Sequence, residues 1–200
     1  RSALRPEGSD RLQSTIFHLI GKPGVGKFTI GSALAAATGA RLVDNHSIAN
    51  VIFNVLDQDG IKPLPEGVWS YVRMVRRAAL DAIIDLSPPE LSFVFTNYLA
   101  GESESEMAVF DEAVAVAEAR GSLFVPVILS CETPELVRRI VSPARKERMK
   151  LIDPVQGARL NDEVPQFSTD HPNVICLDIT RMPPEESARI IIDWASSRGS

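Results

Sequence analysis

The sequence predicts an α/β protein with three layers, in which helices cover both faces of a five-stranded parallel sheet. Short, continuously apolar runs alternate along the chain with segments of helical period. The residues are 44% hydrophobic but only 6% aromatic, which fits the aliphatic interior of a buried parallel sheet. A glycine-rich stretch, GKPGVGK, lies between the first apolar run and the first helical segment.

Five apolar runs are expected to form the strands, because each is short and lacks the alternation of a half-solvated strand. They are residues 16–20, 42–43, 91–95, 123–129 and 174–177. Pro126 lies inside the fourth run, where its missing backbone donor predicts a bulge or a sheet edge.

The segments between these runs carry apolar residues at steps of three and four, as helices with one buried face do. One such face consists of Val68, Val72, Val75, Ala79 and Ile83, and another of Met107, Phe110, Val114 and Ala117. A capping-box pattern at Ser103 and Glu106 predicts the start of the second of these helices. Thr133-Pro134 and Pro183-Pro184 predict two further helix starts.

A single domain over residues 15–200 is expected from the length of 200 residues, preceded by a polar tail at residues 1–14. The least regular part is 142–172, which mixes charges with prolines and a glycine. A segment of that length without elements is usually functional or mobile.

Charge and composition exclude several classes of protein. The formal net charge of −5 argues against a nucleic-acid partner, and no apolar stretch is long enough to span a membrane. Cys131 and Cys176 lack metal-site spacing, so we expect buried free thiols in a reducing cytoplasm. One basic cluster suggests a small anionic ligand; it consists of Arg138, Arg139, Arg145, Lys146, Arg148 and Lys150, with Glu147 as its one acid.

The glycine-rich stretch matches the phosphate-binding pattern G-x-x-x-x-G-K, with a strand before it and a helix after it. Its glycines let backbone N–H groups point at phosphates, and the helix adds its positive end. Lys27 is expected to reach the β- and γ-phosphates of ATP and to act in catalysis. The predicted nucleotide-binding residues are Gly21, Pro23, Gly24, Val25, Gly26, Lys27, Phe28 and Thr29.

Phe28 departs from the general pattern, because a Ser or Thr at that position would be a ligand of Mg²⁺. The hydroxyl comes one residue later, at Thr29. The third strand is expected to end at Thr96-Asn97, where many such proteins carry a metal-directing aspartate. No metal ligand is therefore certain.

Four motifs give the chain a family resemblance over residues 15–195. These are the phosphate-binding loop, VDNH at 43–46, VILSCETPELVRRI at 127–140 and LDITRMPPEE at 177–186. The chain resembles the P-loop small-molecule and nucleotide kinases of the shikimate kinase and adenylate kinase-like group. The resemblance implies a three-layer P-loop fold, in which 142–172 is a small basic lid and the irregular segment that follows it, and ATP and Mg²⁺ as cofactors. It also implies a metal held largely through water and Thr29 near the α-phosphate.

The resemblance also implies roles for single residues. Asp44 would face the acceptor, where it would orient Mg²⁺ through water or take a proton from an acceptor hydroxyl; the alternative is that it only caps a helix. His46 and Arg73 would help to bind the acceptor. In the lid, Arg145 and Arg148 would be catalytic, and Arg138 would contact the nucleotide.

The expected function is transfer of the γ-phosphate of ATP to a small-molecule acceptor. A P-loop ATPase and a nucleotide-binding protein without catalysis are the alternatives. Phe28 and Thr96-Asn97 favour the second of these, because they weaken the metal site. A GTPase is disfavoured, since the D-x-x-G match at 57–60 precedes the third strand and N-K-x-D is absent.

Overall fold

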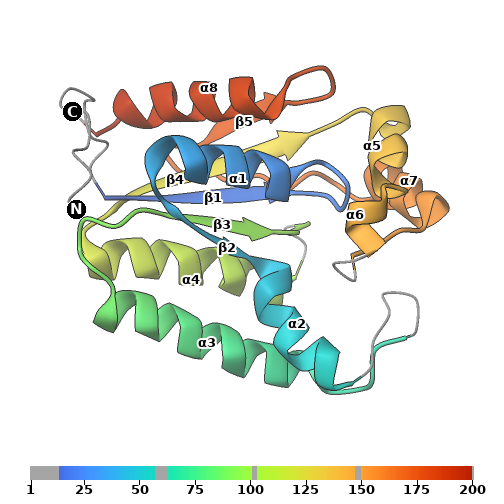
Figure 1. Cartoon of the computed structure of the whole chain (residues 1–200), viewed down its shortest axis with the longest axis horizontal. Coiled ribbons are helices and arrows are strands. Elements are labelled where there is room, and N and C mark those ends of the chain that lie inside the picture. The colour runs from blue at the N-terminus through green and yellow to red at the C-terminus, as the bar shows by residue number, and fades with distance from the viewer. Residues whose placement is uncertain (1–13, 57–62, 101–102, 147–149, 200) are drawn as a thin grey trace, which may run out of the picture.

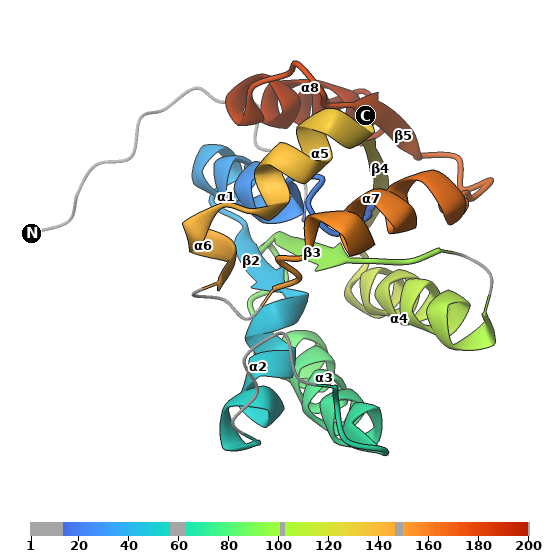
Figure 2. The same cartoon turned by 90° about the vertical axis from the view of Figure 1, so that its right-hand side faces the viewer.

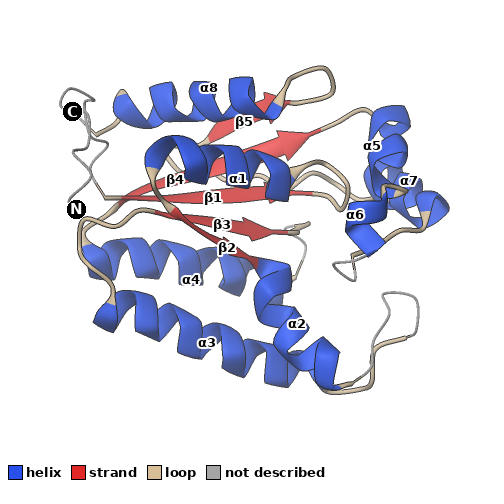
Figure 3. Ribbon diagram, in the orientation of Figure 1, coloured by secondary structure: helices blue, strands red, loops and turns tan. Residues whose placement is uncertain are grey.

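The computed structural model describes residues 14–56, 63–100, 103–146 and 150–199. The sheet is parallel and five-stranded, in the order β2-β3-β1-β4-β5, as Figure 3 shows. Its strands are β1 (Thr15–Gly21), β2 (Arg41–Asp44), β3 (Phe93–Asn97), β4 (Leu123–Ser130) and β5 (Ile175–Asp178). Each strand overlaps one of the five apolar runs, so the predicted fold class is confirmed.

Helices cover both faces of this sheet, with α1 and α8 on one side and α3 and α4 on the other (Figure 1). The helices are α1 (Lys27–Thr38), α2 (Asn45–Val55), α3 (Val68–Leu86), α4 (Glu104–Arg120), α5 (Thr133–Ile140), α6 (Pro143–Lys146), α7 (Pro154–Glu163) and α8 (Pro184–Ser196). Figure 2 shows α5, α6 and α7 gathered around the carboxyl end of the sheet. The faces of the sheet are therefore closed by apolar packing, and its carboxyl end carries the more polar segments.

The sequence patterns that predicted α3 and α4 correspond to buried faces. Val68, Val72 and Ile83 of α3 are buried, as are Phe110 and Ala117 of α4. Met107, predicted on the same face of α4, is instead exposed in the first turn of the helix. The Ser103 hydroxyl accepts a hydrogen bond of 3.2 Å from the backbone N–H of Glu106, which caps α4 as predicted.

Pro126 lies in the interior of β4 without a bulge. The register of β4 with β1 is unbroken from residue 123 to residue 129, and His18 lies opposite Pro126. On the other side, β5 pairs with β4 only from Val127 onward. β4 therefore has a neighbouring strand on one side only at Pro126, and this local edge tolerates the missing donor.

Three details of the sequence interpretation need correction. Cys176 is exposed rather than buried, because β5 is the edge strand and its side chains alternate between half-buried and exposed. α5 has Glu132, not Thr133, at its N-cap position. Residues 142–172 contain two helices; Asp153 caps α7 by accepting hydrogen bonds from the N–H groups of Val155 and Gln156.

In the part of the chain that the structure describes, no helix combines the length and the apolar character needed to cross a membrane.

Candidate functional site

The phosphate-binding loop joins β1 to α1 at the carboxyl end of the sheet. Gly24 and Gly26 have φ angles of 93° and 116°, a left-handed conformation that favours glycine. Gly26 is the N-cap residue of α1 and has no side chain to cap the first turn. The N–H groups of that turn thus keep the orientation that binds an anion.

Lys27 folds back over the loop that precedes it. Its Nζ atom donates hydrogen bonds to the carbonyl oxygens of Gly21 at 2.5 Å and Lys22 at 3.0 Å. Burial, followed by the positive charges of Lys150 and Arg145, lowers the pKa of Lys27 from 10.5 to about 7, while the charge of Asp44 opposes this shift. An anion between these cations would relieve their mutual repulsion.

Two basic side chains fasten the loop to the helices over it. The guanidinium of Arg139 on α5 donates to the carbonyl oxygen of Val25 at 2.8 Å and to that of Ile179 at 2.9 Å. The ammonium of Lys22, almost fully buried, donates to the carbonyl of Asn161 at 2.8 Å and to that of Val164. The loop is therefore held from α5 and from the end of α7.

Apolar packing brings the same helices onto the loop. A Cβ atom on Gly24 would lie 2.7 Å from Cγ1 of Ile140, and one on Gly157 of α7 would lie 2.1 Å from its Cδ1. Leu136 and Ile140 of α5 are fully buried. Only glycine at these two positions permits this approach of the loop, α5 and α7.

Asp44 ends β2 beside the loop, where it is 5% exposed. Its Oδ1 atom accepts a hydrogen bond of 2.6 Å from the Thr96 hydroxyl, and its Oδ2 atom lies 3.2 Å from Nζ of Lys150. Asp44 occupies the N-cap position of α2, but its carboxylate makes no capping hydrogen bond. The capping role considered from the sequence is thus not what the geometry gives.

Some of the other predicted residues lie near Asp44 and Lys27, and others are exposed on the surrounding helices. His46 lies in the first turn of α2, and burial followed by the charge of Lys150 lowers its pKa to about 4. Arg145 of α6 donates to the carbonyl oxygen of Leu151 at 3.0 Å, and burial lowers its pKa. Thr29 is exposed on α1, and Arg73 is exposed on α3. Arg148 lies outside the described residues.

Arg138, the predicted nucleotide contact, has a side chain that is 72% exposed and pairs with Glu135 at 2.6 Å. Its neighbour Arg139 reaches the loop instead. The basic cluster in the sequence indicates this region, but it does not show which of Arg138 and Arg139 contacts the loop.

Lys150 and Thr96 are the site residues that sequence reasoning did not select. Lys150 belonged to the predicted basic cluster, and it is the member whose ammonium pairs with Asp44. Its Nζ atom lies 4.9 Å from the centre of the Phe28 ring. In the sequence, Thr96 stood out only because the end of the third strand lacks a metal-directing aspartate. In the structure its hydroxyl orients Asp44.

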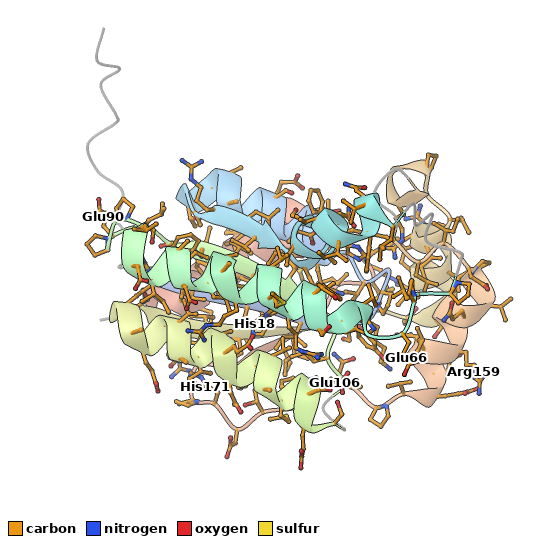
Figure 4. All side chains as sticks on the ribbon, turned by 90° about the horizontal axis from the view of Figure 1, so that it is seen from below. His18, Glu66, Glu90, Glu106, Arg159 and His171 are labelled. Atoms are coloured by element: carbon orange, nitrogen blue, oxygen red, sulfur yellow. The ribbon has the colours of Figure 1, made fainter. Side chains whose placement is uncertain are left out.

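The residue after Thr96 belongs to a buried polar chain. Asn97 donates to Nε2 of His18 at 3.0 Å and accepts from Nη1 of Arg76 at 2.9 Å when its amide is assigned to satisfy both neighbours. Arg76 in turn pairs with Glu112 at 2.9 Å. Burial lowers the pKa of His18 to about 3, so it is a neutral core residue; Figure 4 labels it behind α3 and α4.

The donors present do not form a set for direct coordination of Mg²⁺. Phe28 replaces the hydroxyl that would follow Lys27, Thr96 is bonded to Asp44, and both Asp44 oxygens have partners. Among the residues described, no group of three or more His, Cys, Asp and Glu side chains could hold a metal. Mg²⁺ requires octahedral coordination by oxygen ligands, and the described side chains around Phe28 and Asp44 do not supply them.

A cavity of about 330 Å³ opens beside the loop, next to the carbonyl groups that Arg139 binds. Its lining residues are Glu132, Asp178, Thr180, Arg181, Met182 and Glu186. These come from the ends of β4 and β5 and from the start of α8, so the cavity and the loop share one edge of the sheet.

Solved structures with this architecture include several kinases. A gluconokinase from Sinorhizobium meliloti 1021 is 14% identical with a TM-score of 0.60, covering 94% of this chain and 95% of that one. The Mycobacterium tuberculosis APS kinase CysC, in complex with AMPPNP and APS, is 14% identical with a TM-score of 0.55, covering 92% and 98%. A shikimate kinase from Acinetobacter baumannii, in complex with shikimate, is 16% identical with a TM-score of 0.50, covering 94% and 96%.

Neither a protein-family model nor a curated protein matches the sequence. The structural likeness nevertheless extends over nearly the whole chain, and it confirms at the level of the fold the resemblance that the motifs indicated. The chain has the fold of the P-loop kinases.

Proposed function

We propose that this protein is an ATP-dependent kinase that transfers the γ-phosphate to a small-molecule acceptor. The observation that carries the proposal is the pairing of two groups at one edge of the sheet. Lys27 lies on a loop shaped for phosphates, and Asp44 is a buried carboxylate whose charge acts on Lys27. A phosphate donor and a proton acceptor within electrostatic reach are what phosphoryl transfer to an alcohol requires.

Each residue has a definite part in the proposed reaction. Lys27 and the N–H groups at the start of α1 bind the β- and γ-phosphates, and Lys27 neutralises the charge that grows on the leaving oxygen. Asp44 takes the acceptor's proton as the acceptor oxygen bonds to the γ-phosphorus and the bond to the β-phosphate oxygen breaks. ADP leaves, and the acceptor carries the phosphate.

Two further predicted residues, Arg145 and His46, fit around this reaction. Arg145 adds positive charge near Lys27, and His46, neutral at pH 7, contributes hydrogen bonds rather than charge. The cavity beside Arg139 would take the base of the nucleotide. Closure of α5–α7 over the loop would exclude water, so that the acceptor rather than solvent receives the phosphate.

A reducing cytoplasm is the proposed location, and the free thiols of Cys131 and Cys176 are consistent with it.

The experiment that tests the function measures ADP released from Mg-ATP with and without pooled acceptors: nucleosides, sugars, antibiotics and shikimate-like alcohols. A kinase releases ADP sharply faster with one pool, and dividing that pool identifies the acceptor. Lys27→Ala should abolish the release while far-ultraviolet circular dichroism stays unchanged. Release that ignores every pool would identify an ATPase, and nucleotide binding without release would contradict catalysis.

A further inference from the structure

The second cationic residue at the proposed nucleotide site is Lys150, which follows α6. It is 9% exposed, and its backbone N–H donates to the carbonyl of Arg145 at 3.1 Å. Its charge and that of Arg145 both act on Lys27, whereas Asp44 is, among the described residues, the carboxylate that opposes them there. The site therefore concentrates more positive than negative charge before any phosphate binds.

The position of the Lys150 ammonium is unusual for this loop. Phe28 directly follows Lys27, at the position where a Ser or Thr hydroxyl would bind a divalent cation. The Nζ atom of Lys150 lies 4.9 Å from the centre of the Phe28 ring and 3.2 Å from Oδ2 of Asp44. A cation–π contact and an ion pair thus hold an ammonium beside the residue that takes the place of the metal-binding Ser or Thr.

Phe28 and Lys150 are chemically matched. An aromatic ring cannot be a ligand of Mg²⁺, but its face attracts an ammonium. An ammonium carries three N–H donors, so Lys150 can contact the Asp44 carboxylate and a phosphate oxygen together. A residue without a metal-binding hydroxyl and a buried lysine thus lie in contact beside the loop.

We propose that Lys150 supplies at the β- and γ-phosphates the positive charge that a divalent cation supplies where a hydroxyl follows the loop lysine. ATP therefore binds to this protein without needing Mg²⁺. The inference rests on the nucleotide-binding part of the proposed function and concerns binding, so its test does not depend on turnover.

The test is calorimetric titration of the full chain with ATP, in excess Mg²⁺ and in excess EDTA. For the native protein we expect the two dissociation constants to agree within about threefold, a difference well under one power of ten. Lys150→Met should weaken binding in EDTA about tenfold to a hundredfold, the usual range for one charge-assisted hydrogen bond. Lys150→Arg should retain most of the affinity.

Arg189→Met is the matched control, because it also replaces one cationic side chain with methionine, at an exposed position on α8. It lowers the net charge of the protein as Lys150→Met does, but it should bind ATP like the native protein in both buffers. Thermal unfolding of each variant shows whether it is folded before its affinity is compared.

A second variant tests the same inference in the opposite direction. Phe28→Thr combined with Lys150→Met restores the hydroxyl and removes the ammonium, so its ATP affinity should rise with Mg²⁺ by about tenfold or more. This result would show that hydroxyl-bound metal and Lys150 are interchangeable. If the ATP affinity of the double variant is the same with and without Mg²⁺, a hydroxyl-bound metal cannot replace Lys150.

The inference is overturned if the native protein binds ATP at least about tenfold more tightly with Mg²⁺ than with EDTA. It is also overturned if Lys150→Met binds as the native protein does in EDTA, or if no ATP binds in either buffer. Acceptor-dependent ADP release together with metal-dependent binding would leave the kinase proposal standing without this inference. Metal-independent binding without release in any pool would support this inference and contradict the kinase proposal.

Discussion

The guanidinium of Arg139 hydrogen-bonds the carbonyl oxygen of Val25 at 2.8 Å, so a side chain of α5 holds the middle of the phosphate-binding loop. The same guanidinium donates to the carbonyls of Ile179 and Thr180, between β5 and α8. Arg139 thus joins three segments that are far apart in the sequence. Arg138, its neighbour, instead points to solvent and pairs with Glu135, which Arg139 also contacts.

Arg139→Met is expected to destabilise the fold and weaken ATP binding, whereas Arg138→Met should do neither. The first change leaves carbonyl groups without their charged donor, which costs about 2–3 kcal/mol of unfolding free energy. The second removes one exposed ion pair, worth about 0–1 kcal/mol. Urea denaturation measures both unfolding free energies. Because each variant loses a contact with Glu135, the difference between the two values measures the contribution of the bonds between Arg139 and the loop. Equal destabilisation would contradict the role of Arg139.

The affinity for ATP is expected to fall as the pH rises from 7 to 9. Lys27 has a pKa of about 7 in the ligand-free protein, so above that pH it must regain a proton to bind phosphate as a cation. The affinity should decrease by up to about tenfold per pH unit, and binding should take up protons from the buffer. Calorimetry in buffers of different ionisation enthalpy counts those protons.

Lys27→Met is the control for this pH dependence, because it removes the titrating amine and should abolish the proton uptake. The same pKa has a consequence for folding. It lies below the ordinary value of 10.5, so the unfolded chain binds more protons between the two values. The ligand-free fold should therefore gain stability as the pH rises through that window. An affinity that is constant from pH 7 to 9 would contradict the low pKa.

Asp44→Asn is expected to lower turnover far more than ATP affinity. An amide of the same shape cannot accept the acceptor's proton, and loss of a general base costs about 10²–10⁴ in rate. Steady-state kinetics with the identified acceptor, alongside titration with ATP, separates the two effects. Asp193→Asn, an exposed change on α8, should leave both unchanged. Equal turnover in Asp44→Asn and the native protein would limit Asp44 to positioning neighbouring groups.

Gly157→Ala is expected to lower stability, because its new Cβ atom would lie 2.1 Å from Cδ1 of Ile140. Overpacking of this kind costs about 1–3 kcal/mol. Adding Ile140→Val removes the clashing Cδ1 atom, so the double variant should be more stable than Gly157→Ala alone. Thermal unfolding of the two single variants and the double variant tests this. A double variant that is less stable than either single variant would show that the contact is not limiting.

The sheet and its covering helices could be predicted from the sequence because local patterns determine them. The apolar runs become strands with shifts of one or two residues, and the Ser103 cap lies where its pattern indicated. α7 was missed although Asp153-Pro154 is a regular helix start, since the helix is short and buries only Gly157, so it lacks the apolar periodicity that marks the other helices.

The site was only partly accessible from the sequence. The loop motif is contiguous, so its residues could be named at once. Lys150 and Asp44 are separated by 106 residues and meet only through the fold, and no local pattern relates them. The choice between Arg138 and Arg139 depends on which way each side chain leaves α5, a property that charge content does not encode.

Lys22 connects the loop directly to the end of α7, so movements of the two are coupled. Its ammonium bonds the carbonyl groups of Asn161 and Val164, at and just beyond the end of α7. Any outward swing of α7 must therefore either break those two bonds or pull the loop with it. In the first case the swing is resisted, and in the second it displaces the loop. Release of a nucleotide from the proposed site would therefore be coupled to movement of α7, through Lys22 and through the packing of Ile140 against Gly24 and Gly157.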